Sequence, residues 1–223
     1  HILVAPPGRE PYRFVQTDEE TRAPMTPLGG ARVALMIGDG SPRDIAIVAT
    51  DTGRIVKRIK PPADVTSLAA SPDGRTIYYA AGQTIVSMPA DGGAPTSICA
   101  GDSMAVDPAS GDLIVKLEET ERVRLVRCKS SGPPRDIGVH GDLRLVATPL
   151  MPDAVRDGRL LLAVGSADSW YWFVGALDLA SGRLEKVKIN HFTDFHFASW
   201  AGDGMVLGGG SGVRSALWKF ERK

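Results

Sequence analysis

The sequence predicts an all-β fold built from one repeated unit. Short turns recur at intervals of roughly 40 residues, and each is followed by a run of apolar or aromatic residues. Gly (25) and Pro (16) are frequent among the 223 residues, which indicates many tight reversals rather than long helices. The clearest copy occupies residues 65–93, where the turn Ser71-Pro72-Asp73-Gly74 separates two strand-like runs. The five corresponding turns close at Gly29, Gly74, Gly111, Gly158 and Gly204.

A second series of turns alternates with the first and divides each unit again. These turns contain Gly53, Gly92, Gly132 and Gly182. Each sits between two strand-like runs, so a unit consists of strand A, a turn, strand B, a loop, strand C, a turn and strand D. Four antiparallel strands in about 40–45 residues indicate one blade of a β-propeller, because such sheets cover their faces only by packing around a common axis. We expect about five four-stranded blades.

The last unit is shorter than the others. Its strands are expected at 195–200, 205–208 and 215–220, after which the chain stops. Residues 11–17 have strand character, so we expect the N-terminal strand to complete the last sheet and close the ring. The chain then forms a single domain. The expected blades are 22–60, 64–100, 102–140, 142–190 and 194–223, with residues 10–17 added to the last.

The composition excludes some classes of protein. Lys+Arg and Asp+Glu are balanced at 26 each, which argues against a nucleic-acid-binding protein. No run approaches the roughly 18 apolar residues of a membrane-spanning helix, so we expect no membrane segment within this chain. The chain begins at His1 without a signal-peptide pattern, which favours an excised domain or mature fragment.

The two cysteines, Cys99 and Cys128, do not form a Cys-x-x-Cys motif, so a zinc or dithiol redox motif is not indicated. The expectation is two half-buried thiols on strands. A disulfide is the alternative, because the sequence alone does not show whether the two residues meet.

The run Leu68-Ala69-Ala70-Ser71-Pro72-Asp73-Gly74-Arg75-Thr76-Ile77-Tyr78-Tyr79 resembles the repeat core of TolB-like, WD-repeat-like bacterial β-propellers. The turns Asp51-Thr52-Gly53-Arg54 and Ala180-Ser181-Gly182-Arg183 resemble the turn before the fourth strand in that family. The Gly-His and Trp-Asp dipeptides of true WD repeats are absent. The resemblance implies an interaction module, either the C-terminal sensor-like domain of a bacterial Ser/Thr kinase or part of an envelope protein, with a periplasmic or extracytoplasmic location.

No catalytic motif is present, so no catalytic residue, metal or cofactor is predicted. The stretch Gly208-Gly209-Gly210-Ser211-Gly212-Val213 lacks the final glycine of a serine-hydrolase elbow. The Asp residues of the repeat turns lack the alternating oxygen ligands of a calcium loop, and they suit a tight reversal instead.

The leading hypothesis for function is a non-catalytic module that binds a protein, a peptide or a small ligand. Strand parity places the B–C and D–A loops at the same end of the ring, and the resemblance implies that ligands meet the mouth of the central channel there. Three adjacent aromatics, Trp170, Tyr171 and Trp172, cannot all point inward from one strand, so at least one ring should be exposed. The candidate contact residues at this end are Arg43, Glu121, His140, Trp170, Tyr171, His191, Asp194 and Arg214.

Two alternatives have different site requirements. A propeller hydrolase or lactonase would hold a metal on the channel axis, with carboxylates and imidazoles converging from several blades. The residues available for that role are Asp39, Asp102, Asp142, Asp194 and His196. A purely structural spacer would show no exposed aromatic patch at the loop end.

Overall fold

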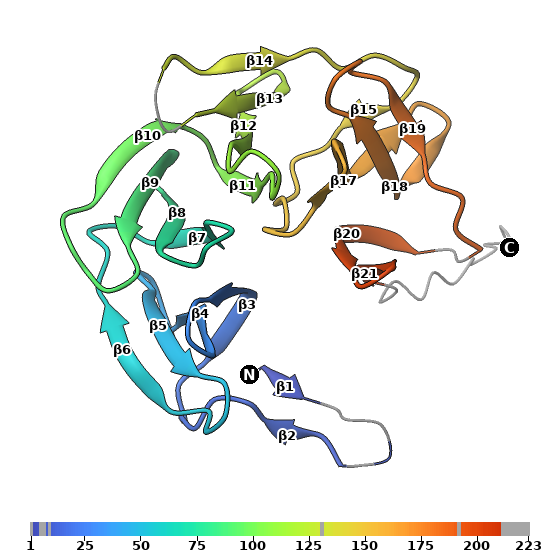
Figure 1. Ribbon diagram of the computed structural model, residues 1–223. Helices are drawn as coiled ribbons and strands as arrows, with labels where there is room; N and C mark the ends of the chain where they lie inside the picture. The colour runs from blue at the N-terminus through green and yellow to red at the C-terminus, as the bar shows by residue number, and fades with distance from the viewer. Residues whose placement is uncertain (1, 5–7, 9, 130–131, 191–192, 211–223) are drawn as a thin grey trace, which may run out of the picture.

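The protein is an all-β propeller, as the repeat predicts. The computed structural model describes residues 2–4, 8, 10–129, 132–190 and 193–210, and every regular element in these ranges is a strand. The sheets lie around a common centre, with the first strand of each toward the middle and the last at the periphery (Figure 1). No helix in the described part of the chain is long and apolar enough to cross a membrane.

The first three blades are four-stranded antiparallel sheets whose strands follow chain order from the centre outward. Blade one contains β3 (Thr21–Leu28), β4 (Arg32–Ile37), β5 (Asp44–Ala49) and β6 (Ile55–Ile59). Blade two contains β7 (Val65–Ala70), β8 (Thr76–Ala81), β9 (Thr84–Pro89) and β10 (Thr96–Ala100). Blade three contains β11 (Ser103–Val106), β12 (Leu113–Glu118), β13 (Val123–Cys128) and β14 (Arg135–Ile137).

Blade four departs from this pattern because its inner strand is broken. Its elements are β15 (Arg144–Leu145), β16 (Val155–Arg156), β17 (Arg159–Ser166), β18 (Ser169–Asp178) and β19 (Leu184–Lys186). Both β15 and β16 pair with β17, and β18 occupies the other edge of β17. The two short strands therefore share one edge, and residues 146–154 between them leave the sheet. We call this segment the cavity loop.

The remaining strands precede blade one or follow blade four in the chain. The structure describes two strands of the fifth sheet, β20 (Asp194–Ala201) and β21 (Gly204–Gly210), which pair antiparallel. The N-terminal β2 (Tyr12–Arg13) pairs with β1 (Leu3–Val4). The partner predicted for the N-terminal strand, at 215–220, lies outside the described residues, so closure of the ring by this strand stays a prediction.

Apolar side chains pack between consecutive blades, which explains the nearly continuous apolar strands. Ile47 of blade one and Leu68 and Tyr79 of blade two belong to one buried cluster. Ile85 of blade two and Met104 of blade three belong to the next, and equivalent clusters join blade three to four and four to five. Blades two, three and four are thus each covered on both faces by neighbouring blades.

The A–B turns explain a glycine requirement at the contact between blades. Gly74, which closes the Ser-Pro-Asp-Gly turn, has φ +66°, and a Cβ there would lie 2.2 Å from the backbone nitrogen of Gly29 in blade one. Gly111 occupies the same position in blade three with φ +74°, but no atom lies within 4 Å of its Cβ position. Glycine is therefore needed at Gly74 for both backbone conformation and close approach, and at Gly111 for conformation alone.

The expectation of two free thiols is wrong. Cys99 on β10 and Cys128 on β13 form a disulfide that joins blade two to blade three. The two residues are 29 positions apart in sequence, and only the packing of consecutive blades brings their strands together. Both side chains are buried within the cluster between these blades.

Candidate functional site

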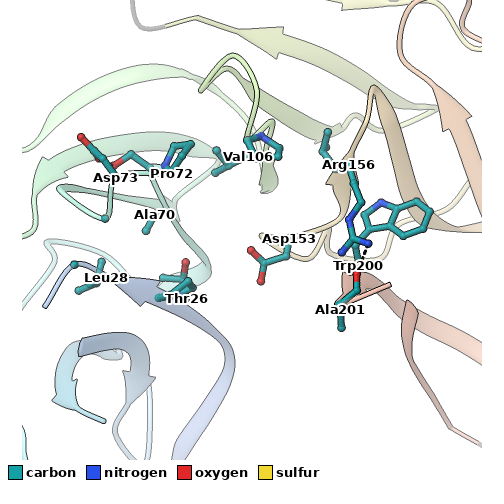
Figure 2. Close-up of a pocket in the computed structure, with 17 residues that line it drawn as sticks. Thr26, Leu28, Ala70, Pro72, Asp73, Val106, Asp153, Arg156, Trp200 and Ala201 are labelled. Atoms are coloured by element: carbon teal, nitrogen blue, oxygen red, sulfur yellow. Dashed lines mark hydrogen bonds between the residues drawn. The ribbon is translucent and has the colours of Figure 1, made fainter. Parts of the chain in front are cut away.

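The candidate site is a cavity of about 500 Å³ at the centre of the ring. It is lined by residues at or next to the A–B turns of all five blades, including Leu28, Asp73, Pro108, Arg156 and Gly202. Figure 2 shows these walls and the side chains that face the space between them. Because B–C and D–A loops lie at the opposite end of the strands, the cavity opens on the other face of the ring from the one predicted.

The cavity loop forms one wall and is held by both neighbouring blades. The amide of Val106 in β11 donates to the carbonyl oxygen of Pro152 at 3.0 Å, and the amide of Trp200 in β20 donates to the carbonyl oxygen of Asp153 at 3.1 Å. The amide of Leu150 donates to Oγ of Ser103 at 3.0 Å. The loop thus takes the place of the middle of the inner strand and forms backbone hydrogen bonds with blades three and five.

A buried lysine supports the start of this loop. Lys116 on β12 is fully buried, and its Nζ donates to the carbonyl oxygens of Val146 at 3.0 Å and Thr148 at 2.6 Å. Burial lowers the pKa of Lys116 from 10.5 to about 8, and the negative charge of Glu118 opposes this shift. The lysine satisfies carbonyl groups that lost their strand partners where the inner strand breaks.

Asp153 carries the free carboxylate of the site. Its side chain points into the cavity (Figure 2), and among the described residues it has neither a hydrogen-bond donor nor a cation as partner. Burial by the surrounding protein raises the pKa of Asp153 above its usual value, although the side chain remains accessible from the cavity. This carboxylate is therefore partly desolvated without a compensating charge.

The other charged groups of the cavity wall already have partners. The Asp73 carboxylate accepts hydrogen bonds from Oγ of Ser71 at 2.5 Å and from the amide of Arg75 at 3.0 Å, and these bonds lower its pKa. The Arg156 guanidinium lies 5.1 Å from the ring centroid of Trp200 and donates to the carbonyl oxygen of Gly202 at 2.5 Å. Figure 2 shows Arg156 lying alongside Trp200.

None of the contact residues predicted from sequence lines this cavity. Two of them serve as links between loops. Arg43 donates from its backbone amide and from Nη1 to the Asp64 carboxylate, at 2.8 and 3.1 Å. Asp194 accepts a hydrogen bond from the amide of Trp172 at 2.9 Å. Both contacts join a B–C loop or its following strand to the chain entering the next blade.

The other predicted contact residues within the described ranges are exposed. Trp170 is 98% exposed and Tyr171 is 44% exposed, which confirms the expectation of an exposed aromatic ring. Both belong to β18 rather than to a loop, so the strand extends further than the sequence suggests. His140 lies beside a polar hollow between blades three and four, and Glu121 is exposed. His191 and Arg214 lie outside the described residues.

The residues considered for a metal site do not converge. Among the residues that the structure describes, no group of three or more His, Cys, Asp or Glu side chains is arranged to hold a metal ion. Asp39 accepts from the amide of Glu20, and Asp102 accepts from the amide of Glu118. The His196 ring packs edge-on against Trp172, with the ring centroids 5.1 Å apart. Asp142 is exposed.

Sequence reasoning missed Asp153, Lys116 and the cavity loop. The available signal was a pair of prolines, Pro149 and Pro152, placed where the inner strand of the fourth unit should run. Proline removes a hydrogen-bond donor from a sheet and is rarely found within a central strand. That pattern indicates a break in the strand, but it does not show where the released chain goes.

Antiparallel sheets packed around a central cavity define a β-propeller, the class of this protein. No protein-family model and no curated protein matches the sequence. Similar solved structures are propeller-containing proteins, and they confirm the TolB-like β-propeller fold.

The structure of TolB from Acinetobacter baumannii is similar with a TM-score of 0.62 and 14% identity, over 90% of this chain and 54% of that one. A chain of a nidogen/laminin complex gives a TM-score of 0.59 and 12% identity, over 83% of this chain and 70% of that one. Puromycin hydrolase is similar with a TM-score of 0.62 and 20% identity, over 91% of this chain and 36% of that one. The chain thus spans about half the length of the TolB chain, and likeness at these identities shows the fold alone.

Proposed function

We propose that this chain is a non-catalytic β-propeller module that binds or senses a protein, peptide or small ligand in its central cavity. The observation that carries the proposal is the break in the inner strand of blade four. Instead of a continuous strand, a loop held by blades three and five forms part of the cavity wall. The volume of about 500 Å³ lies within the range of roughly 300–1,000 Å³ typical of small-ligand sites.

Binding is favoured over hydrolysis because the acid and imidazole groups considered for catalysis make local contacts. Asp39, Asp102 and Asp194 each accept a hydrogen bond from a backbone amide of the chain beside them in space. The His196 ring packs against the ring of Trp172. The match to a nidogen/laminin complex supports a partner-binding role, whereas the match to puromycin hydrolase keeps the hydrolase or lactonase as the competing hypothesis. A stoichiometric metal in the purified protein would favour the hydrolase.

The parent protein and its location follow from the resemblance and stay proposals. A signalling kinase or an envelope protein would each place the propeller outside the cytoplasm. The Cys99–Cys128 disulfide supports this location, because such bonds persist mainly in oxidising compartments.

The test is selection of ligands from a random peptide library, with the chain as bait and a variant whose cavity is filled as counter-bait. Ala201→Trp fills the cavity from the exposed end of β20. Ala109→Trp adds the same ring at an exposed residue of the blade-three A–B turn that does not itself line the cavity, and serves as the matched control. We expect selected peptides to bind the chain and Ala109→Trp but to lose binding to Ala201→Trp. Peptides that bind all three proteins equally would refute the cavity as the site.

The exposed aromatics of β18 are a second surface to test in the same selection. If selected peptides ignore Ala201→Trp and instead lose binding to Trp170→Ala or Tyr171→Ala, the binding face is the one predicted from sequence. If neither change affects them, these two aromatics take no part in peptide binding.

A further inference from the structure

We propose that the central cavity recognises a cationic group on an apolar stem, the chemistry of a lysine or arginine side chain, and that Asp153 is its counter-ion. This inference rests on the proposed function and specifies the ligand class for the same site. Three features of the cavity wall support it: the charges of its side chains, its shape and polarity, and the hydrogen bonds that hold its main chain in place.

The first argument is charge. Of the three charged side chains that line the cavity, Asp73 is bound by its own turn, and Arg156 is bound by Trp200 and by the carbonyl oxygen of Gly202. Asp153 alone has no partner within the described residues. A carboxylate that faces the cavity without a counter-ion can form a charge-assisted hydrogen bond with an incoming cation, without first breaking an existing ion pair.

The second argument is shape and polarity. Three prolines line the cavity together with Val106 and Val155: Pro27 near the end of β3, and Pro72 and Pro108 in the A–B turns of the next two blades. All five residues present apolar carbon atoms, and the three prolines have no backbone N–H group to donate. They suit the methylene stem of a long basic side chain, whose charged end can then reach Asp153.

The third argument is rigidity. The carbonyl oxygen of Asp153 accepts from Trp200 and that of Pro152 accepts from Val106, so the backbone on either side of the carboxylate is fixed by two blades. Lys116 fixes the start of the same loop. The main chain that carries the carboxylate is therefore held in place before a ligand binds, which lowers the ordering cost of recognition at this position.

The experiment compares four peptides of the form acetyl-Gly-Gly-X-Gly-Gly-amide, in which X is lysine, arginine, norleucine or glutamate. Norleucine keeps the apolar stem of lysine and lacks its charge. Binding is followed by the NMR shift of the Trp200 indole N–H, because this ring lines the cavity. Butylammonium chloride is titrated as well, to distinguish a free amine from a side chain carried by a peptide.

We expect the lysine and arginine peptides to bind at least tenfold more tightly than the norleucine peptide, and the glutamate peptide not to bind. Asp153→Asn should reduce the affinity for both basic peptides to the norleucine level. Asp157→Asn removes an equal charge from the adjacent turn, at a positive φ that asparagine tolerates, and should leave binding unchanged. Binding also lowers the pKa of Asp153, which carbon-13 NMR of its carboxyl group measures directly.

Equal binding of lysine and norleucine peptides, or equal binding by Asp153→Asn and the unmodified chain, would overturn the inference. So would the absence of a saturable shift with either basic peptide at millimolar concentration. If library selection nevertheless gives cavity-dependent peptides without lysine or arginine, the inference fails while the proposed function stands. If no selected peptide depends on the cavity, the proposed function itself fails.

Discussion

Lys116 gives the sharpest test of how the cavity loop is held. The side chain is fully buried on β12 and donates to the carbonyl oxygens of Val146 and Thr148. Replacement with methionine keeps the length of the side chain but removes its charge and its donors. The variant therefore isolates what a buried ammonium group does to the stability of the ring.

The sign of the effect follows from the pKa. Burial lowers the pKa of Lys116 from 10.5 to about 8 in the folded state, so the protonated amine is less favourable there than in the unfolded chain. The difference corresponds to a cost of roughly 3 kcal/mol below pH 8, at about 1.4 kcal/mol for each tenfold change in the proton affinity. Between pH 8 and 10.5 the unfolded chain binds more protons than the folded chain, so stability contributed by this residue rises with pH.

The assay is urea unfolding of the unmodified chain and of Lys116→Met at pH 7, 8, 9 and 10. The quantity to plot is the difference between their free energies of unfolding, because most other titrating groups cancel in it. The unmodified chain should gain roughly 2–3 kcal/mol relative to the variant between pH 7 and pH 10. Lys60→Met, at an exposed lysine, is the matched control and should show no such gain.

A flat difference across this pH range would refute the reasoning, because it would mean that the amine keeps its water or acquires a compensating anion in the folded chain. A difference that falls with pH would point to a raised pKa and therefore to an ion pair, which the structure does not contain at Lys116. Both results would also remove the support that the lysine gives to the position of Asp153.

Replacing both Cys99 and Cys128 with alanine should lower the free energy of unfolding by roughly 3–4 kcal/mol, the chain-entropy value for a loop of this length, and urea unfolding with and without reductant measures it. Gly111→Ala should cost about 1–2 kcal/mol for its left-handed backbone, and Gly74→Ala roughly 1–3 kcal/mol more because its Cβ meets the backbone of blade one; equal losses in thermal unfolding would contradict this contact. Asp153→Asn should stabilise the fold increasingly as pH rises through the acidic range. Burial raises the pKa of Asp153 in the folded chain, so its ionised form is disfavoured there, and the neutral amide avoids this cost. A variant less stable at neutral pH than the unmodified chain would show that the carboxylate has a favourable partner.

The architecture could be predicted because it is encoded locally and repeatedly. A turn such as Ser71-Pro72-Asp73-Gly74 depends only on the residues within it. Because similar turns recur at regular intervals, each one supports the assignment of the others. The glycine conformation predicted at Gly74, Gly111 and Gly158 is present, with positive φ at all three. In the first and fifth turns, however, Gly30 and Gly202 have positive φ rather than Gly29 and Gly204, because the position that needs this conformation depends on the length of the turn.

The site could not be predicted because it arises where the repeat fails. The expectation that ligands meet the B–C and D–A loops came from strand parity and from family resemblance, and it singled out residues such as Arg43 and Asp194. These residues instead tie loops to the chain entering the next blade, a role that requires knowledge of which loops are adjacent in space. The pairing of Cys99 with Cys128 depends on the offset between neighbouring blades and was equally inaccessible from sequence.

The cavity loop combines two features that each oppose folding. It lies against a buried lysine whose charged form is disfavoured there, and it carries an aspartate whose charged form is also disfavoured. The inner strands of blades one to three show that the fold does not need such a loop, because continuous strands β3, β7 and β11 serve the same position. A departure from the repeat that combines a buried lysine with an unpaired carboxylate is not accounted for by stability, and it fits the proposed ligand recognition. On that argument, substitutions that restore a continuous inner strand should strengthen the fold and abolish binding in the cavity together.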